Sequence, residues 1–218
     1  LFSKGQFILG EEVEKFEKNI CKFLKVKNCV ALNSGTDALV IGMHLLGIKK
    51  NDEVITPPNS FVASTAAIVH LGAIPVFADV KEDQNIDPKD IERKINKRTK
   101  AIMPVHLSGY PCEMDKIIKI SKKYQIPIIE DAAQSIGTKY KDKFVGTFGE
   151  VGCFSAHPLK NLNAIGDAGY LITNNNKLAE TAKLLRNHGI KKRNEILKFG
   201  YVSRMDNLQA AVLNIRFK

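Results

Sequence analysis

The sequence predicts an α/β fold in which a mostly parallel β-sheet carries helices on both faces. Short runs of aliphatic and β-branched residues alternate along the chain with longer segments whose apolar residues recur at helical spacing. One apolar run leads through Glu130 into Asp131, the position at which a parallel strand delivers a functional side chain to a cleft. No linker divides the chain, so residues 1–218 are predicted to form one domain.

The strands of the sheet are predicted from short apolar runs that end at polar or turn-forming residues. Pro57 and Pro58 end one of these runs, and Asp131 follows closely on another. We expect strands at residues 29–32, 53–56, 74–80, 101–106, 126–129, 151–154 and 170–173.

Helices are predicted where apolar residues repeat every three or four positions. In the first, residues 10–24, the stripe of Val13, Phe16, Ile20 and Phe23 is interpreted as core. Residues 138–150 are expected to be a connection rich in Gly and Lys, and the basic segment 191–198 to be mobile. Further helices are expected after the segment 33–39 through Leu46, from Asn59, from the Asp87 cap, at 113–124, at 177–188, and from Tyr201 to the chain end.

Composition is that of an ordinary globular protein, with 44% hydrophobic residues and enough length for one sizeable core. No apolar run reaches the length of a membrane span and no signal-peptide pattern opens the chain, so we expect a cytoplasmic protein without a membrane partner. The chain begins with Leu1, and we expect that its natural start is missing. Cys21, Cys29, Cys112 and Cys153 lack paired metal spacing and are interpreted as reduced thiols in or near the core.

The formal net charge is +10. A basic chain can bind nucleic acid, but the lysines are spread over helices and loops without a clustered arm or a nucleic-acid motif. An attraction for anionic small molecules, such as a nucleotide-sugar diphosphate, fits the charge equally well. A salt-dependent gel shift would test the nucleic-acid alternative, which rests on charge only.

Two side chains near predicted strand ends indicate a cofactor. Asp131 follows one apolar run, and Lys160 lies in a proline-containing loop after the run that ends at Ser155. A lysine that bonds to a carbonyl and an acidic residue that holds a cationic ring nitrogen are what a protein contributes to pyridoxal phosphate chemistry. On spacing alone, Lys160 as a solvated surface charge and Asp131 as a turn former remain open.

A second candidate site lies where residues 29–32 run into Asn-Ser-Gly-Thr at 33–36 and then into a helix. The free N–H groups and the positive end of a helix make such a turn an anion site. Because Ser-Gly-Thr also caps helices that bind nothing, the pattern alone leaves a structural role open.

The residues of these sites resemble the DegT/DnrJ/StrS family of pyridoxal-phosphate-dependent aminotransferases, and the resemblance extends over nearly the whole chain. It is carried by Ser-Gly-Thr-Asp-Ala-Leu at 34–39, Glu-Asp-Ala-Ala-Gln-Ser at 130–135, Phe-Ser-Ala-His-Pro-Leu-Lys-Asn at 154–161 and Gly-Asp-Ala-Gly at 166–169. The resemblance implies an aspartate-aminotransferase-like (fold type I) large domain that forms a homodimer with its active site at the interface. The small C-terminal domain of the family is expected to be absent from this chain.

The resemblance also implies roles for individual residues. Lys160 would form a Schiff base with pyridoxal 5′-phosphate and act as general base and acid, while Asp131 would keep the ring nitrogen protonated. His106 is interpreted as a structural hydrogen-bonding residue, and no metal is expected. The other cofactor contacts would be Gly35, Thr36 and Ser155 at the phosphate, Phe61 and Ala133 on the ring faces, and Gln134 near the ring hydroxyl.

In that family the amino donor is usually glutamate and the acceptor a nucleotide-linked keto-sugar, so we expect an aminotransferase of amino-sugar or surface-polysaccharide biosynthesis. A sugar dehydratase of the same family is an alternative, but those enzymes carry His in place of Lys160. A non-catalytic cofactor-binding or regulatory fragment is a second alternative.

The sequence departs from the family pattern at two positions. Ala168 stands where the family usually has Gly, and since Ala accepts a positive φ poorly, we expect a rearranged loop. Val202 replaces an Asn that would cross the dimer to the partner's phosphate. We expect Ser203, the Val202 backbone N–H or water to compensate, with Arg204 occupied by Asp206.

Overall fold

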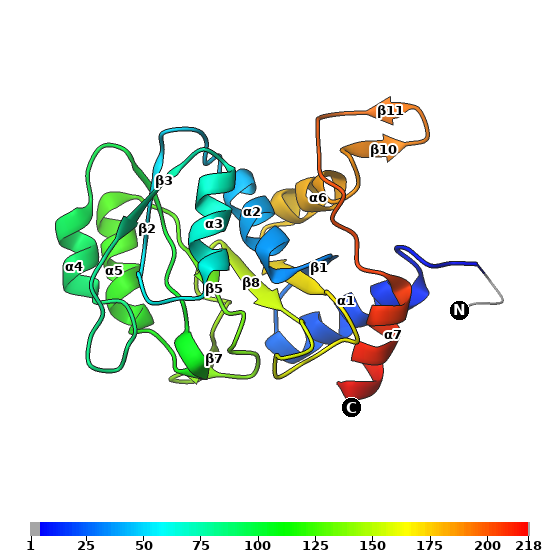
Figure 1. The fold of residues 1–218 in the computed structure, drawn as a ribbon, viewed down its shortest axis with the longest axis horizontal. Coiled ribbons are helices and arrows are strands. Elements are labelled where there is room, and N and C mark those ends of the chain that lie inside the picture. The colour runs from blue at the N-terminus through cyan, green and yellow to red at the C-terminus, as the bar shows by residue number, and fades with distance from the viewer. Residues whose placement is uncertain (1–4, 218) are drawn as a thin grey trace.

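The computed structural model describes residues 5–217 and confirms the predicted α/β architecture (Figure 1). Two isolated parallel bridges, Ile102–Ile128 and Val105–Asp131, join β4 to β5 and give the strand order β3-β2-β4-β5-β8-β9-β1. The strands of this sheet are β1 (Asn28–Leu32), β2 (Glu53–Thr56), β3 (Ile74–Phe77), β4 (Thr99–Ile102), β5 (Ile129–Asp131), β8 (Val151–Ser155) and β9 (Gly169–Thr173).

The sheet is mostly parallel, as predicted. β2 pairs in parallel with β3 and β4, and β5 pairs in parallel with β8. β9 runs against both β8 and β1, so it is the strand of opposite direction in the part of the sheet described. The shared direction brings the carboxyl ends of the other strands to one edge, where such sheets bind ligands.

Helices cover both faces of the sheet (Figure 1). Consecutive strand residues point to opposite faces, so Val54 packs in the first helical layer and Ile55 in the second. The first layer contains α2 (Gly35–Leu45), α3 (Val62–His70) and α6 (Asn176–Leu185); the second contains α1 (Glu11–Leu24), α4 (Pro88–Lys94), α5 (Met114–Tyr124) and α7 (Asn207–Arg216).

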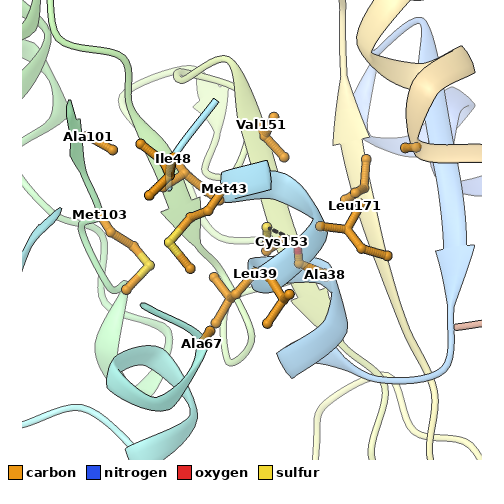
Figure 2. Packing of buried hydrophobic residues seen from close by; sticks show 14 of the residues in the cluster. Ala38, Leu39, Met43, Ile48, Ala67, Ala101, Met103, Val151, Cys153 and Leu171 are labelled. Carbon is orange, nitrogen blue, oxygen red and sulfur yellow. Dashed lines mark hydrogen bonds between the residues drawn. The ribbon is translucent and has the colours of Figure 1, made fainter. Parts of the chain in front are cut away.

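Helix α2 is enclosed by the core, with every residue from Ala38 to Met43 buried. Figure 2 shows Met43 facing Met103, and the Cys153 thiol donating to the Ala38 carbonyl at 3.2 Å. Burying one such aliphatic side chain contributes roughly 1.5–3 kcal/mol. The packing therefore holds α2, and with it the helix N-terminus at the edge of the sheet, in a fixed position.

Two segments differ from the sequence prediction. The last helix begins at Asn207 and not at Tyr201, because the preceding residues are extended and Ser203 N–H donates to the Arg186 carbonyl at 2.9 Å. The segment predicted to be mobile forms a hairpin of β10 (Ile190–Lys192) and β11 (Glu195–Ile196), which projects from the body in Figure 1.

Two smaller differences concern the connection at 138–150 and the end of α1. The connection at 138–150 contains a second hairpin, β6 (Lys139–Tyr140) and β7 (Lys143–Phe144). Phe23 was predicted to be core but is 39% exposed, and its ring packs near the surface against Phe144 and Phe217.

The start of α1 is capped by a residue from the other end of the chain. Gly10 precedes the helix and has no side chain to cap it. Instead the Asn207 Oδ1 accepts the N–H groups of Glu12 at 3.1 Å and Val13 at 3.3 Å. A Cβ added to Gly10 would lie 2.3 Å from the Asn207 amide nitrogen, so this contact requires glycine.

The four cysteines are free, with Cys29, Cys112 and Cys153 buried and Cys21 half-buried, as predicted. Across residues 5–217, none of the helices combines the length and the apolar character that crossing a bilayer requires.

Candidate active site

The carboxyl edge of the sheet borders a cavity of about 510 Å³. Residues from several strand ends and two helix starts converge on it, although they are far apart in sequence. The cavity is lined by all the residues predicted to contact a cofactor, namely Gly35, Thr36, Phe61, Asp131, Ala133, Gln134, Ser155 and Lys160. Their individual roles toward a cofactor stay predictions.

Asp131 ends β5 and is only 4% exposed. Its carboxylate accepts hydrogen bonds from the Ser64 hydroxyl at 2.7 Å and from the Ala133 N–H at 3.1 Å. Burial raises the pKa of Asp131 above its ordinary value, while these hydrogen bonds and the nearby charge of Lys160 oppose the rise. A carboxylate held in this way is stabilised by any cation that enters the cavity.

A tight turn after β8 presents Lys160 to the cavity. Its backbone N–H donates to the His157 carbonyl at 2.8 Å, and the Leu159 N–H donates to the His157 Nδ1 at 3.2 Å. Within residues 5–217 the Lys160 amine has no hydrogen-bond or ion-pair partner. Its charge still lowers the pKa of Asp131, so the two groups interact electrostatically across the cavity.

The N-terminus of α2 forms another wall. Ser34 caps the helix by accepting the Asp37 N–H at 3.0 Å, and the first N–H groups of the helix lack partners within it. A Cβ on Gly35 would lie 2.7 Å from the Cβ of Ser155, so glycine is required for β8 to end this close to the helix. The N–H groups, the hydroxyls of Thr36 and Ser155 and the positive helix end suit a phosphate.

The remaining predicted contacts also fit a ring-shaped ligand. Phe61 is 69% exposed although it is aromatic, and it borders the cavity. Gln134 accepts the Ser108 N–H on its Oε1 at 2.7 Å, which fixes its amide and leaves the amide N–H groups for a ligand. Ala133 adds a small side chain beside Asp131.

Ser64, the buried partner of Asp131, was not among the site residues predicted from the sequence. The sequence contains only a weak signal for Ser64. It lies three positions after Phe61, near the start of α3, and residues three apart lie on the same face of a helix. A small hydroxyl residue in a helix is unremarkable until the fold places Asp131 opposite it.

The structure corrects the expectations for the two departures from the family pattern. Ala168 does not adopt a positive φ, so the backbone strain that was the reason to expect a rearranged loop is absent. The Ser203 hydroxyl is already used, because it donates to Asp37 at 2.7 Å and accepts the Asn33 N–H at 3.3 Å.

Arg204 was expected to pair with Asp206, but it instead donates to the Asn187 amide oxygen at 3.1 Å. Val202 itself is 60% exposed. Ser203 is therefore not the free donor that was expected to compensate for valine at position 202.

The donor set fits pyridoxal phosphate. A buried carboxylate suits a protonated ring nitrogen, an unpaired lysine suits a carbonyl, and a glycine-lined helix start suits a phosphate. Over residues 5–217 there is no group of three or more side chains arranged to hold a metal ion. Fold and cavity together define a pyridoxal-phosphate-type site in an α/β enzyme.

Comparison with known proteins agrees. The sequence model of the DegT/DnrJ/EryC1/StrS aminotransferase family matches residues 1–218, and the chain belongs to this family. The crystal structure of NtdA from Bacillus subtilis, with its cofactor PMP bound, has a TM-score of 0.95 at 37% identity and covers 100% of this chain and 50% of that one. The predicted fold class and cofactor are thereby confirmed.

Two relatives illustrate the range of names in the family. The UDP-2-acetamido-2-deoxy-3-oxo-D-glucuronate aminotransferase of Pseudomonas aeruginosa is 43% identical over 210 residues, covering 96% of this chain and 58% of that protein. A pleiotropic regulatory protein of Geobacillus stearothermophilus is 42% identical over 214 residues, covering 98% and 58%. The chain thus spans little more than half the length of these relatives.

Proposed function

We propose that this chain supplies the cofactor-binding and catalytic part of an aminotransferase that moves an amino group from an amino acid to a nucleotide-linked keto-sugar. The observation that carries the proposal is the convergence of Asp131, Lys160 and the α2 N-terminus on one cavity. The name of the Pseudomonas aeruginosa relative supports the substrate class. When bound, pyridoxal phosphate supplies an electron sink for the carbanion that forms as a substrate carbon loses its proton.

The residues of the chain divide this work. Lys160 would bind the cofactor carbonyl, and its amine would take up and return the proton of the donor Cα. Asp131 holds a proton on the ring nitrogen through a charge-assisted hydrogen bond. The other proposed contacts are Gly35, Thr36 and Ser155 at the phosphate, Gln134 at the ring hydroxyl, and Phe61 and Ala133 at the ring faces.

Five finer points belong to the same proposal. The amino donor is glutamate, the product enters amino-sugar or surface-polysaccharide synthesis, and nucleic acid is not a partner. The protein works in the cytoplasm, which its four free thiols support. It acts as a homodimer with the active site at the interface; the exposed Ile196, Leu197 and Phe199 beside the projecting hairpin support an apolar contact there.

Borohydride reduction of the protein loaded with pyridoxal phosphate tests the central claim. We expect peptide mapping to find the pyridoxyl group on Lys160, and a Lys160→Ala control to remain unlabelled. Stable labelling of another lysine, such as Lys139, with Lys160 unmodified would refute the assignment.

Substrate class is tested separately by incubating the full-length protein with glutamate and a panel of UDP- and dTDP-linked keto-sugars. Formation of 2-oxoglutarate and of an amino sugar in equal amounts is expected. The name of the Geobacillus relative suggests a regulatory role as the alternative. A regulatory protein would bind the cofactor but would turn over none of the sugars in the panel.

A further inference from the structure

Glu130 precedes Asp131 but points to the opposite face of the sheet, where its side chain is fully buried. Its carboxylate accepts four hydrogen bonds, two on each oxygen, which is the full capacity of an ionised carboxylate. The donors are His106 Nε2 at 3.0 Å and Gly146 N–H at 2.7 Å on one oxygen, and Phe148 N–H at 2.6 Å and Gly149 N–H at 2.7 Å on the other.

His106 is also fully buried, and its ring has a defined proton position. The Nδ1 atom accepts the Cys112 N–H at 3.1 Å, so the ring proton lies on Nε2, which faces Glu130. The backbone of His106 holds the site strand, because its N–H donates to the Asp131 carbonyl at 3.0 Å and its carbonyl accepts the Ser135 hydroxyl at 2.6 Å.

The backbone donors on Glu130 belong to the loop that leads into β8. Gly146 has a φ of +83°, and a Cβ there would lie 2.4 Å from the Phe154 ring. The loop therefore lies directly against β8, the strand that carries Ser155 and leads to Lys160. Glu130 thus links the strand of Asp131 to the strand of Lys160 through one buried carboxylate.

We propose that Glu130 and His106 are positioning residues for the cofactor, and that together they fix Asp131 relative to the β8 end and the Lys160 turn. Neither residue lines the cavity, so both act through Asp131 and β8. The proposal rests on the cofactor site of the proposed function and is independent of the sugar substrate.

The substitution Glu130→Gln isolates this role because it keeps the shape of the side chain. An amide offers one oxygen, and its NH₂ group would face either two loop N–H groups or Gly146 N–H and His106 Nε2–H. His106 cannot remove the conflict by moving its proton, since Nδ1 would then face the Cys112 N–H. The loop and the strand of Asp131 must therefore separate slightly.

We expect Glu130→Gln to weaken pyridoxal phosphate binding by about tenfold, on the scale of outer-shell losses around bound metals. Equilibrium dialysis measures this loss. The ¹⁵N chemical shift of the ring nitrogen in bound, labelled cofactor is expected to report deprotonation at a lower pH than in the wild type. A purely structural role would change thermal stability without moving that pH.

Glu53→Gln is the matched control. Glu53 is a buried carboxylate at the opposite edge of the sheet, where it accepts the Asn96 amide at 2.6 Å. We expect it to lower stability while leaving the cofactor dissociation constant and the ring-nitrogen titration unchanged. Equal effects of the two substitutions on binding and titration would overturn the proposal.

Two substitutions of His106 test the positioning role even if the Glu130→Gln variant does not fold. His106→Gln keeps a donor at the Nε2 position toward Glu130, and His106→Asn keeps only the acceptor for Cys112. The glutamine variant should retain most of the binding and the asparagine variant should lose about tenfold. Equal binding by both variants would overturn the proposal, whereas absent labelling of Lys160 in the wild type would overturn the proposed function instead.

Discussion

The Ser64 hydroxyl donates a hydrogen bond of 2.7 Å to the Asp131 carboxylate, and both side chains are buried. The bond crosses from α3 in the first helical layer to the end of β5 in the sheet. Because it lowers the pKa of Asp131 while burial raises it, Ser64 favours the ionised carboxylate at the place where a ring nitrogen would bind.

Ser64→Ala is expected to weaken pyridoxal phosphate binding by about 1.5–3 kcal/mol, the scale of a hydrogen bond to a charged group. Without the hydroxyl, the pKa of Asp131 rises further, so the loss should be greater at pH 5 than at pH 8. Equilibrium dialysis across this range measures it. Ser60→Ala, at a half-buried serine next to Phe61, is the control, and an equal loss there would show that the Asp131 contact is not the cause.

Asp131→Asn is expected to slow amino transfer by about a hundredfold or more, because it removes the charge that keeps the ring nitrogen protonated. Near-normal turnover of the variant would mean that another group serves the ring nitrogen.

The same substitution should stabilise the cofactor-free protein. The pKa of folded Asp131 lies above the ordinary 3.8, so ionising it opposes folding once the pH rises above about 4. The free energy of unfolding of Asp131→Asn should therefore increase relative to wild type between pH 4 and pH 7, as measured by urea denaturation. A constant difference across that range would contradict the raised pKa.

Val202→Asn is expected to tighten cofactor binding by at most about 1.5–3 kcal/mol, the scale of one hydrogen bond to a charged group. Val202 is 60% exposed and Ser203 is held by Asp37, so an added amide would supply a donor that this segment lacks if the proposed dimer brings it to the partner's phosphate. Val69→Asn, at another exposed valine, is the control. Equal or weaker binding by Val202→Asn would show that the segment stays away from the phosphate.

Asn207→Ala is expected to lower the free energy of unfolding by about 0.5–2 kcal/mol, the range for loss of a helix cap. In this variant the Glu12 N–H loses its acceptor, while the Val13 N–H keeps only its bond to the Gly10 carbonyl at 3.0 Å. Asn207→Asp keeps that acceptor and loses only the amide donor to the Gln6 carbonyl, so it should retain most of the stability. Urea unfolding that ranks the two variants in the reverse order would disprove the capping role.

The site residues that lie at strand ends have only partial signals in the local sequence. Asp131 and Lys160 follow apolar runs, and Gly35 stands between a strand and a helix, but chain order and residue type left a structural role open for each, and the resemblance to the aminotransferase family singled them out. The stripe of α1 was also predictable for Val13, Phe16 and Ile20, because helical spacing defines a face.

Other features depend on which segments meet in space. Phe23 continues the same stripe yet is 39% exposed, and its ring neighbours, Phe144 and Phe217, come from distant parts of the chain. Ser64 has meaning only opposite Asp131, and Glu130 only beside the loop at 146–149. Spacing along one element carries no information about such partners.

The cap of α1 has a consequence for synthesis on the ribosome. Helix α1 is translated long before the side chain that closes its first turn, which is made 195 positions after Glu12. Until Asn207 arrives, the leading helix has open N–H groups, which favours fraying of its first turn. The first turn of α1 is therefore completed only after α7 has been made, and a ribosome that pauses before α7 would hold a chain in which α1 is still unfinished.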